Sequence, residues 1–352
     1  MTVKDGNIRA VVVDDSPTAR ELLVGLFEAS GIRVVGVGKN GEDAVQLVSR
    51  LRPDVISMDV MMPKMDGLEA TRQIMRHFPT PIVVVTTDLM REDTDLTFEA
   101  LKAGALTAVK KPGLNDTETC DEVVRTVRLM SSVKVVQRWS TDHKPHRQSP
   151  VDPAVILDER RTIKMIGIAA STGGPGILAG ILKPLPKDFP IPILIVQHVT
   201  DGFASGLAQW LDSQVELPVR LAGHGDIPGP GMILMPPDDY HMQINKQGVI
   251  ELSKAPHYKG LRPSANYLFY SMGRFLGPYT IGIILTGMGD DGSDGLETMH
   301  QAGALTIAQN EQSCIIYGMP REAIVRNAVD RVLNPRQISA LLSQLSSKPM
   351  DR

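Results

Sequence analysis

The sequence predicts two α/β domains, the first a doubly wound parallel sheet of five strands and the second a mainly parallel sheet with an antiparallel extension. Three observations support this prediction. Short β-branched runs alternate with amphipathic stretches over residues 8–130, a polar and proline-bearing segment follows, and the alternation then resumes. A length of 352 residues also favours two domains over one. We therefore expect domains over residues 1–130 and 162–352, joined by an interdomain linker over residues 131–161.

The first domain is expected to alternate five strands with five helices. The strands are the apolar runs bounded by turn residues, at 8–15, 32–38, 54–60, 81–88 and 105–112. The helical patterns lie at 16–30, 41–51, 66–78, 93–104 and 116–130. This alternation implies right-handed crossovers and helices on both faces of the sheet, which is a flavodoxin-like arrangement.

The second domain is expected to contain three buried parallel strands, at residues 163–170, 191–198 and 280–287. Between the last two of these, residues 218–252 carry turn signals and little helical period. Short strands and hairpins are therefore expected there, as the antiparallel extension. Residues 334–345 predict a final amphipathic helix.

The composition excludes several classes of protein. The net charge is −3, which argues against nucleic acid or an anionic membrane surface as a partner. The two cysteines, Cys120 and Cys314, lie far apart and form no metal-ligand pattern, as in reduced thiols of a cytosolic protein. The first residues lack a signal-peptide pattern, and no apolar run is long enough to cross a bilayer. We expect a cytoplasmic protein that does not insert directly into membranes.

Polar residues stand at the ends of four predicted strands of the first domain. They are Asp14, Asp15, Asp59, Thr86 and Lys111. Because functional residues of an open parallel sheet gather at its carboxyl edge, these side chains are expected around one crevice. Clustered carboxylates repel one another unless a cation intervenes, and oxygen ligands suit Mg²⁺. Helix capping is the alternative interpretation, and it is favoured for Asp15 taken alone.

The same residues favour phosphoryl chemistry. A metal ion beside Asp59 would neutralise an incoming phosphoryl group, which makes Asp59 a candidate carboxylate nucleophile. Thr86 is expected to hydrogen-bond the added phosphoryl oxygens, and Lys111 to pair with them electrostatically.

The motifs VVVDDSP, SMDVMMPKMDG, VVVTT and VKKP resemble those of response-regulator receiver domains throughout residues 8–130. The resemblance implies a histidine kinase as phosphodonor and Mg²⁺ for phosphorylation. It also implies a role for each of the five residues: Mg²⁺ ligands Asp14, Asp15 and Asp59, phosphorylation of Asp59, and a switch at Thr86 and Lys111. Ala108 stands where such receivers typically carry Phe or Tyr, and the Lys111–Pro112 bond resembles one that is often cis.

Ser171 ends an apolar run in the stretch GIAASTGG. This stretch nearly matches the nucleophile elbow of hydrolases, with Ala169 at a glycine position, and small neighbours allow a tight turn. Two alternatives remain open for the motif alone. Ser171 is equally suited to cap the next helix, and Gly173 and Gly174 are suited to cradle a phosphate.

Two later strands end in residues that are able to activate a serine. His198 closes the second predicted strand, at the same sheet edge as Ser171, although a lone histidine is more often structural. The third strand runs into MGDDGSDG, where Asp290 or Asp291 is able to orient an imidazole. A solvated turn is the alternative for this loop, since it lacks the spacing of a calcium-binding loop.

Residues 162–348 resemble the chemotaxis protein-glutamate methylesterase (CheB) family in the motifs IAASTGGP, QHVTDGF, LRPSANYLFYS, LTGMGDDGSDG and SCIIYGMPREA. The resemblance implies a catalytic triad of Ser171, His198 and Asp291, with no cofactor in this domain. It also implies supporting roles: an oxyanion hole that uses the Met288 N–H, positioning of His198 by Thr172, and Arg262 in the substrate cleft. The chain departs from the family pattern at QHVT, at Ala222 and at Asn266, where the family commonly has aspartate.

The function that the resemblance implies is phosphorylation-activated hydrolysis of glutamate γ-methyl esters, with deamidation of glutamines as a second activity. The implied substrate is the cytoplasmic domain of methyl-accepting chemoreceptors, and the implied phosphodonor is the histidine kinase of the chemotaxis system. Two rivals are a regulator whose second domain only binds a ligand or receptor, and an enzyme with the same chemistry on other esters or amides. A DNA-binding output is disfavoured, because the sequence has no evident helix-turn-helix and no basic bias.

Overall fold

The computed structural model describes residues 8–86, 91–113, 116–133, 135 and 162–346. The chain divides into two compact units, residues 1–146 and 147–352, and each is described by itself. The predicted linker lies almost wholly outside the described residues. The predicted domain limits at residues 130 and 162 therefore stay predictions.

The first unit is a five-stranded parallel sheet with the strand order β2-β1-β3-β4-β5. This is the order of a flavodoxin-like doubly wound fold, so the predicted fold class is confirmed. The strands are β1 (Arg9–Val13), β2 (Arg33–Gly38), β3 (Val55–Met58), β4 (Ile82–Thr86) and β5 (Thr107–Lys110). The helices are α1 (Pro17–Ala29), α2 (Gly41–Leu51), α3 (Gly67–His77), α4 (Arg91–Ala103) and α5 (Thr117–Ser131).

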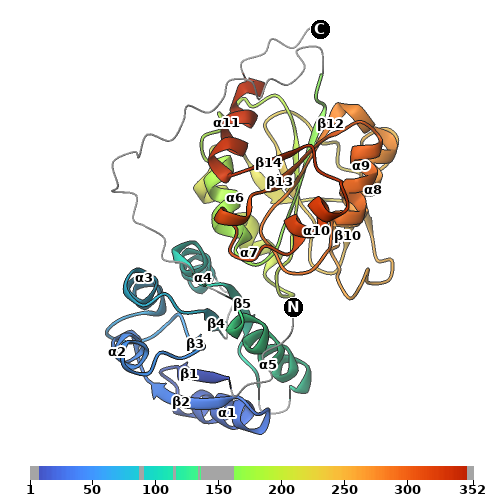
Figure 1. Ribbon diagram of the computed structural model, residues 1–352. Helices are drawn as coiled ribbons and strands as arrows, with labels where there is room; N and C mark the ends of the chain where they lie inside the picture. The colour runs from blue at the N-terminus through green and yellow to red at the C-terminus, as the bar shows by residue number, and fades with distance from the viewer. Residues whose placement is uncertain (1–7, 87–90, 114–115, 134, 136–161, 347–352) are drawn as a thin grey trace. The chain divides into compact units, whose positions relative to one another are not determined.

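Helices cover both faces of this sheet, with α1 and α5 on one face and α2, α3 and α4 on the other (Figure 1). The strands β1, β3 and β4 are apolar along almost their whole length because both of their faces are covered. Local signals define where the helices begin. Ser16, Asn40 and Asp66 each accept a hydrogen bond from a backbone N–H in the first turn of α1, α2 and α3.

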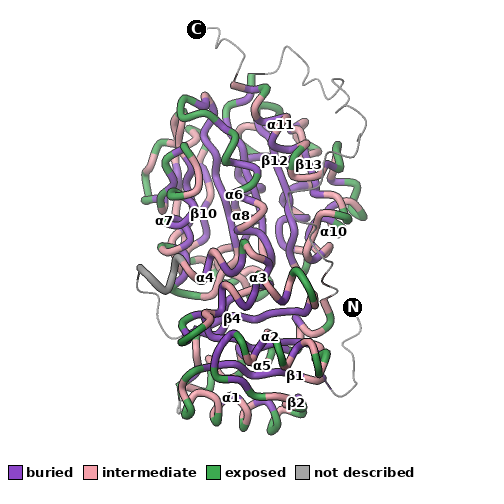
Figure 2. The backbone as a smooth tube through the Cα atoms, turned by 90° about the vertical axis from the view of Figure 1, so that its left-hand side faces the viewer, coloured by how far each residue is buried: buried purple, intermediate pink, exposed green. Residues whose placement is uncertain are grey.

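The second unit is built on a seven-stranded parallel sheet with the order β14-β13-β12-β6-β7-β9-β8. Its strands are β6 (Met165–Ala170), β7 (Ile193–Gln197), β8 (Val219–Leu221), β9 (Ile233–Met235), β12 (Thr280–Ile284), β13 (Leu305–Gln309) and β14 (Arg331–Leu333). Figure 2 shows the central strands of this sheet as buried along their length. A separate antiparallel pair is formed by β10 (His241–Ile244) and β11 (Ile250–Ser253).

Helices also cover this second sheet. They are α6 (Gly174–Leu182), α7 (Ala204–Gln214), α8 (Ala265–Phe275), α9 (Ser293–Gln301), α10 (Met319–Val325) and α11 (Pro335–Ser346), with 3-10 turns η1 (Gly277–Tyr279) and η2 (Glu311–Ser313). Glycines let α8 and α9 lie close on one face. A Cβ on Gly167 would come within 2.7 Å of Met272 Sδ on α8, and one on Gly282 within 2.6 Å of Leu296 Cδ1 on α9.

The strand order reverses direction between β6 and β12. From β6 the chain moves outward through β7 to β8 and β9, whereas β12, β13 and β14 extend the sheet on the other side. Such a reversal opens a crevice outside the carboxyl ends of the two strands, where ligands of α/β proteins commonly bind. Ser171 follows β6 and the GDDG loop follows β12, so both lie at this crevice.

The structure corrects the predicted antiparallel extension in part. Only β10 and β11 are antiparallel, while β8 and β9 join the main sheet as parallel strands. Helix α7 returns the chain between β7 and β8, and a long loop separates β8 from β9, so neither connection is a hairpin. The strands β13 and β14 were absent from the predicted set, because β14 has only three residues and the apolar run of β13 is broken by Thr306 and ends in Gln309. Among the described residues, no helix is long and apolar enough to cross a membrane.

Candidate active site and acidic pocket

Ser171 lies on a sharp turn between β6 and α6. The residue at the N-cap of α6 is Gly173, which has φ of +78° and makes no side-chain capping bond. A Cβ at Gly173 would lie 2.5 Å from Ile315 Cδ1, so both the backbone angle and the packing require glycine. Ser171 is therefore not the cap of this helix, and the first alternative for the motif fails.

The backbone around Ser171 is held against the segment that follows β12. The Ser171 N–H donates to the Thr286 carbonyl at 3.0 Å, and a Cβ on Gly287 would lie only 2.7 Å from Ser171 Cβ. The Gly174 N–H donates back to the Ser171 carbonyl at 2.8 Å. That N–H is thus already satisfied, which weakens the phosphate-cradle alternative.

His198 and Asp291 meet at the same sheet edge. His198 Nε2 lies 2.8 Å from Asp291 Oδ2, and the side chains are 11% and 3% exposed. The His198 N–H donates to the Ala170 carbonyl at 2.9 Å, which places the imidazole next to the Ser171 turn. An ionised Asp291 accepts a hydrogen bond, so the proton belongs on Nε2 and Nδ1 is left as the basic nitrogen.

Asp291 is the acidic residue that faces the histidine, whereas Asp290 pairs with Lys259 at the surface. Burial alone would raise the pKa of the Asp291 carboxyl. Hydrogen bonds from His198, from Ser264 and from the Ala265 N–H outweigh that effect, so the pKa lies below its ordinary value. The carboxylate thus stays charged where it contacts the imidazole.

Within the described part of the chain, no hydrogen bond joins Ser171 Oγ to the His198 imidazole. Such a bond between nucleophile and base is often long without substrate and tightens in the complex. The N–H of Met288, the residue after Gly287, also makes no hydrogen bond among the described residues. A half-buried N–H without a partner is suited to stabilise an oxyanion.

Thr172 and Arg262, the two remaining predicted site residues of this unit, make hydrogen bonds with other segments of the chain. The Thr172 carbonyl accepts a hydrogen bond from Thr286 Oγ1 at 3.0 Å. Arg262 directs its guanidinium to Asp239, with Nε at 2.7 Å from Oδ1, and to the Ala255 carbonyl at 3.0 Å. In this arrangement Arg262 fastens the loop that precedes α8.

Sequence reasoning missed Gln197, the last residue of β7. Its Nε2 donates to the carbonyls of both Ser171 and His198, each at 2.8 Å. Its Oε1 is buried and makes no hydrogen bond, because it packs against Gly174, where a Cβ would lie 1.9 Å away. Gln197 therefore links the backbones of the two residues proposed to react. The signal that could have identified Gln197 is its polar side chain at the end of the otherwise apolar run IPILIV.

Thr286 is a second buried residue that sequence reasoning left without a role. Its hydroxyl accepts hydrogen bonds from the N–H groups of Ile315 and Ile316, at 3.1 and 3.0 Å, and donates to Thr172. Its backbone N–H donates to Gln309 Oε1 at 2.8 Å. Thr286 thus joins the Ser171 turn to the segment before α10.

Two histidines that the sequence left unassigned have structural contacts. His224 Nδ1 accepts from the Leu252 N–H at 3.3 Å. His241 stacks on Tyr267 with ring centroids 3.8 Å apart, and its Nδ1 accepts from the Ser264 N–H at 3.2 Å. Burial lowers the pKa of His241, which keeps Nδ1 free of a proton and able to accept.

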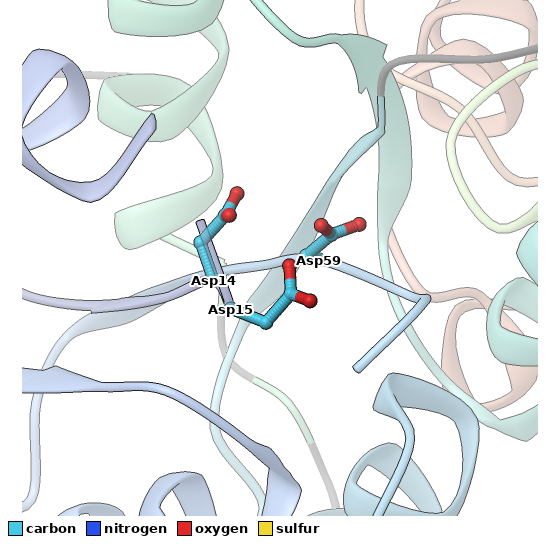
Figure 3. A group of neighbouring side chains, drawn as sticks. All are labelled: Asp14, Asp15 and Asp59. Carbon is cyan, nitrogen blue, oxygen red and sulfur yellow. The ribbon is translucent and has the colours of Figure 1, made fainter. Parts of the chain in front are cut away.

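In the first unit, the three predicted acidic residues lie together at the carboxyl edge of the sheet (Figure 3). One carboxylate oxygen each from Asp14, Asp15 and Asp59 lies within 4.8 Å of the others. Asp14 and Asp59 are buried while Asp15 is exposed. An all-oxygen set with one side open to solvent fits Mg²⁺, which keeps several waters.

Lys111 stands between two of these carboxylates. Its Nζ lies 2.6 Å from Asp14 Oδ2 and 2.7 Å from Asp59 Oδ2. Burial raises the pKa of Asp59, and the contact with Lys111 only partly opposes this. Burial would lower the pKa of Lys111, but hydrogen bonds to Asp14 and Asp59 outweigh it and raise that pKa. The ammonium is therefore held charged next to the proposed phosphoryl acceptor.

A cavity of about 480 Å³ opens over this cluster. Its lining includes Asp59, Thr86 and Lys111, so all three predicted phosphorylation residues border one space. Ala108 is buried within β5. The expectation of a cis Lys111–Pro112 bond is wrong, since the only cis peptide among the described residues is at Arg262–Pro263. The trans form is the intrinsically favoured one, by about 0.5–1 kcal/mol.

Comparison with known proteins identifies both units. Residues 166–342 match the family model described as CheB methylesterase, and residues 10–123 match that of the response regulator receiver domain. A Syntrophus aciditrophicus protein named protein-glutamate methylesterase/protein-glutamine glutaminase 1 is 43% identical over 347 residues, covering 96% of this chain and 98% of that protein. A protein of Geobacter metallireducens named protein-glutamate methylesterase/protein-glutamine glutaminase 4 is 42% identical, covering 96% and 99%.

A solved structure is similar to the second unit. The crystal structure of the Thermotoga maritima CheB methylesterase catalytic domain matches with a TM-score of 0.50 and 35% identity. The match covers 52% of this chain and 99% of that one.

Proposed function

Because the chain belongs to the CheB methylesterase family and carries a response-regulator receiver domain, we propose that it is a protein-glutamate methylesterase and protein-glutamine glutaminase controlled by phosphorylation. The observation that carries the proposal is the meeting of three strand ends. Ser171 follows β6, His198 follows β7 and Asp291 follows β12, with the imidazole 2.8 Å from the carboxylate.

Ester hydrolysis proceeds in two halves in this proposal. Ser171 Oγ attacks the γ-carbonyl carbon of a glutamyl methyl ester while His198 Nδ1 accepts the hydroxyl proton. The tetrahedral oxyanion accepts a hydrogen bond from the Met288 N–H. The oxyanion collapses, the C–O bond to the methoxy group breaks, and the imidazolium gives its proton to the departing methoxide, which leaves as methanol.

Water completes the cycle. His198 takes a proton from water as its oxygen attacks the acyl-enzyme, and Ser171 Oγ leaves with that proton, restoring glutamate and free enzyme. Glutamine deamidation follows the same two halves with ammonia as the first leaving group. Asp291 remains ionised throughout and stabilises the imidazolium that forms in each half.

The proposed substrate is the cytoplasmic domain of methyl-accepting chemoreceptors, which places the work of this protein in the cytoplasm. The proposed phosphodonor is the histidine kinase of the chemotaxis system. Asp59 receives the phosphoryl group, while Thr86 and Lys111 hold its oxygens. Asp14, Asp15 and Asp59 would hold Mg²⁺, which when bound offsets the negative charge of the phosphoryl group. Phosphorylation then shifts the population toward the active enzyme.

Methanol release from methylated chemoreceptor membranes tests the proposal, with and without a small-molecule phosphodonor. Wild type should release methanol, Ser171→Ala should not, and the phosphodonor should raise the wild-type rate. Asp59→Asn should keep the basal rate and lose the stimulation. Absence of release by wild type would defeat the esterase, and full stimulation of Asp59→Asn would defeat control through Asp59.

A further inference from the structure

Asn266, the second residue of α8, contacts the carboxylate of the proposed triad. Its Nδ2 donates to Asp291 Oδ1 at 2.9 Å, and the residue is fully buried. The orientation of the amide is defined by its other end, because Asn266 Oδ1 accepts from the Gly295 N–H at 2.7 Å. A backbone N–H only donates, so the oxygen belongs at Gly295 and the NH₂ group at Asp291.

Asp291 accepts hydrogen bonds on every side. Oδ1 receives Ser264 Oγ at 2.5 Å as well as Asn266 Nδ2, and Oδ2 receives the Ala265 N–H at 2.7 Å as well as His198. Two carboxylate oxygens offer about four lone-pair sites, and four donors fill them. Three of the four come from the N-cap Ser264 and the first two residues of α8, so this helix end is built around the charge of Asp291.

Helix packing brings the Asn266 amide to this position. Helices α8 and α9 approach so closely that a Cβ on Gly295 would lie 2.7 Å from Phe269 Cβ and 3.0 Å from the Asn266 carbonyl oxygen. Because residue 295 is glycine, its N–H reaches the Asn266 side chain. The amide is therefore held at both ends, between α9 and Asp291.

We propose that Asn266 is a positioning residue that keeps the His198–Asp291 pair in one charge state, because it presents a donor to Asp291 that never titrates. The inference rests on the proposed function, in which this pair drives the esterase. An uncharged amide fixes the carboxylate without adding an ionisation of its own. The pair then works in the same way at neutral and alkaline pH.

Other titratable side chains lie on the elements around the pair, and those other than His257 have hydrogen-bond or ion-pair partners. They are His241, which interacts electrostatically with Asp291, together with His257, Lys259, Arg262, Asp290, Asp294 and Arg326. Asp290 and Asp294 both pair with Lys259, and Arg326 also pairs with Asp294. These ion pairs do not involve Asp291. Among the described residues, the side-chain amide that contacts Asp291 is that of Asn266.

Replacement of this amide by a carboxylic acid tests whether Asp291 needs a donor that does not titrate. In Asn266→Asp an oxygen takes the place of Nδ2 next to Asp291 Oδ1, while the acceptor for Gly295 is retained. Two carboxyl groups at this distance share one proton, and the pair titrates in two widely separated steps. With the proton in place the acid donates as the amide did. Once it leaves, two carboxylates repel each other and Asp291 is displaced from His198.

The test is the pH dependence of kcat/KM for methanol release, with the Ser171→Ala rate subtracted at each pH. Asn266→Asp should match wild type in the acid range and acquire a descending alkaline limb, with a loss of about tenfold, the effect of one charge-assisted hydrogen bond. Asn266→Leu lacks a donor at every pH, so its loss should be uniform. Asn334→Asp, which adds the same charge at the start of α11, should keep the wild-type profile.

Two results would overturn the inference. One is an Asn266→Asp profile with the wild-type shape. The other is an equal, pH-independent loss in Asn266→Asp and Asn266→Leu, which indicates only a packing role. Thermal unfolding of each variant identifies those that do not fold. Wild-type activity that depends on Ser171 separates these results from failure of the proposed function, which would leave no activity in wild type.

Discussion

The acidic pocket of the first unit and the active site of the second both bury aspartates at the carboxyl edge of a parallel sheet. Asp291 receives four donors, and its pKa is lowered in spite of burial. Asp59 receives the Lys111 ammonium and the Val60 N–H, and its pKa is raised by burial. The comparison indicates that a buried carboxylate whose lone pairs are all filled by protein donors serves to orient a neighbouring side chain. A buried carboxylate that still has unfilled lone pairs and borders a cavity is available to bind a ligand.

The largest expected effect, on kcat, comes from replacing Asp291, the carboxylate whose lone pairs are all filled. Asp291→Asn should lower kcat for methanol release by about 10⁴-fold, because the imidazole loses both its orienting acceptor and the charge that stabilises imidazolium. Asp290→Asn is the matched control, since Asp290 pairs with Lys259 at the surface. A similar loss in both variants would show that the two neighbouring aspartates do not differ as their contacts indicate.

A smaller effect is expected from removing the side chain that links the backbones of Ser171 and His198 in the active site. Gln197→Met keeps the length of the side chain but removes the donor to the carbonyls of Ser171 and His198. We expect kcat to fall about tenfold and stability by about 1–3 kcal/mol, because two backbone acceptors lose a partner. The control is Gln243→Met, whose amide reaches Glu251 on the antiparallel pair. Wild-type kcat in Gln197→Met would limit Gln197 to packing.

The smallest expected effect is on thermal stability, where the Asp59 and Asp291 carboxylates should contribute with opposite sign. The ionised form of Asp59 is disfavoured in the folded state, so its penalty develops as the pH rises from the ordinary pKa of 3.8 through the raised folded value. Asp59→Asn should therefore raise the Tm of the first unit at pH 7. For Asp291 the sign is opposite. Its contribution is present above the ordinary value of 3.8 and is lost as the pH falls through the lowered folded pKa.

Asp291→Asn should accordingly lower the Tm of the second unit at pH 7. Shifts of roughly 2–8 °C correspond to about 1 kcal/mol in domains of these sizes. Calorimetry of both variants beside wild type, with EDTA present to remove divalent cations, measures the two shifts. Shifts of the same sign would contradict the difference drawn between the two sites.

Much of the fold was predictable because its signals are local. Each predicted strand of the first domain contains a strand of the structure, and the helix from Pro335 to Ser346 matches the predicted final helix. Alternation of buried strands with amphipathic helices leaves few ways to build a sheet. The strands β8, β9 and β14 have three residues each, too few to show their direction or partners. Their pairing depends on segments far away in the sequence.

The sequence by itself determined the two α/β domains, the acidic residues at the strand ends of the first and the candidates for a serine hydrolase in the second. It did so because strand and helix periods, turn residues and motifs are all written within a few neighbouring positions. Only the tertiary structure decided that Gly173 rather than Ser171 lies at the helix start, that the Asp291 carboxylate lies 2.8 Å from His198 Nε2, and that the Asn266 amide completes the ring of donors. The reason is physical, since each of these outcomes depends on hydrogen bonds between atoms that the strand order and the close packing of α8 on α9 bring together.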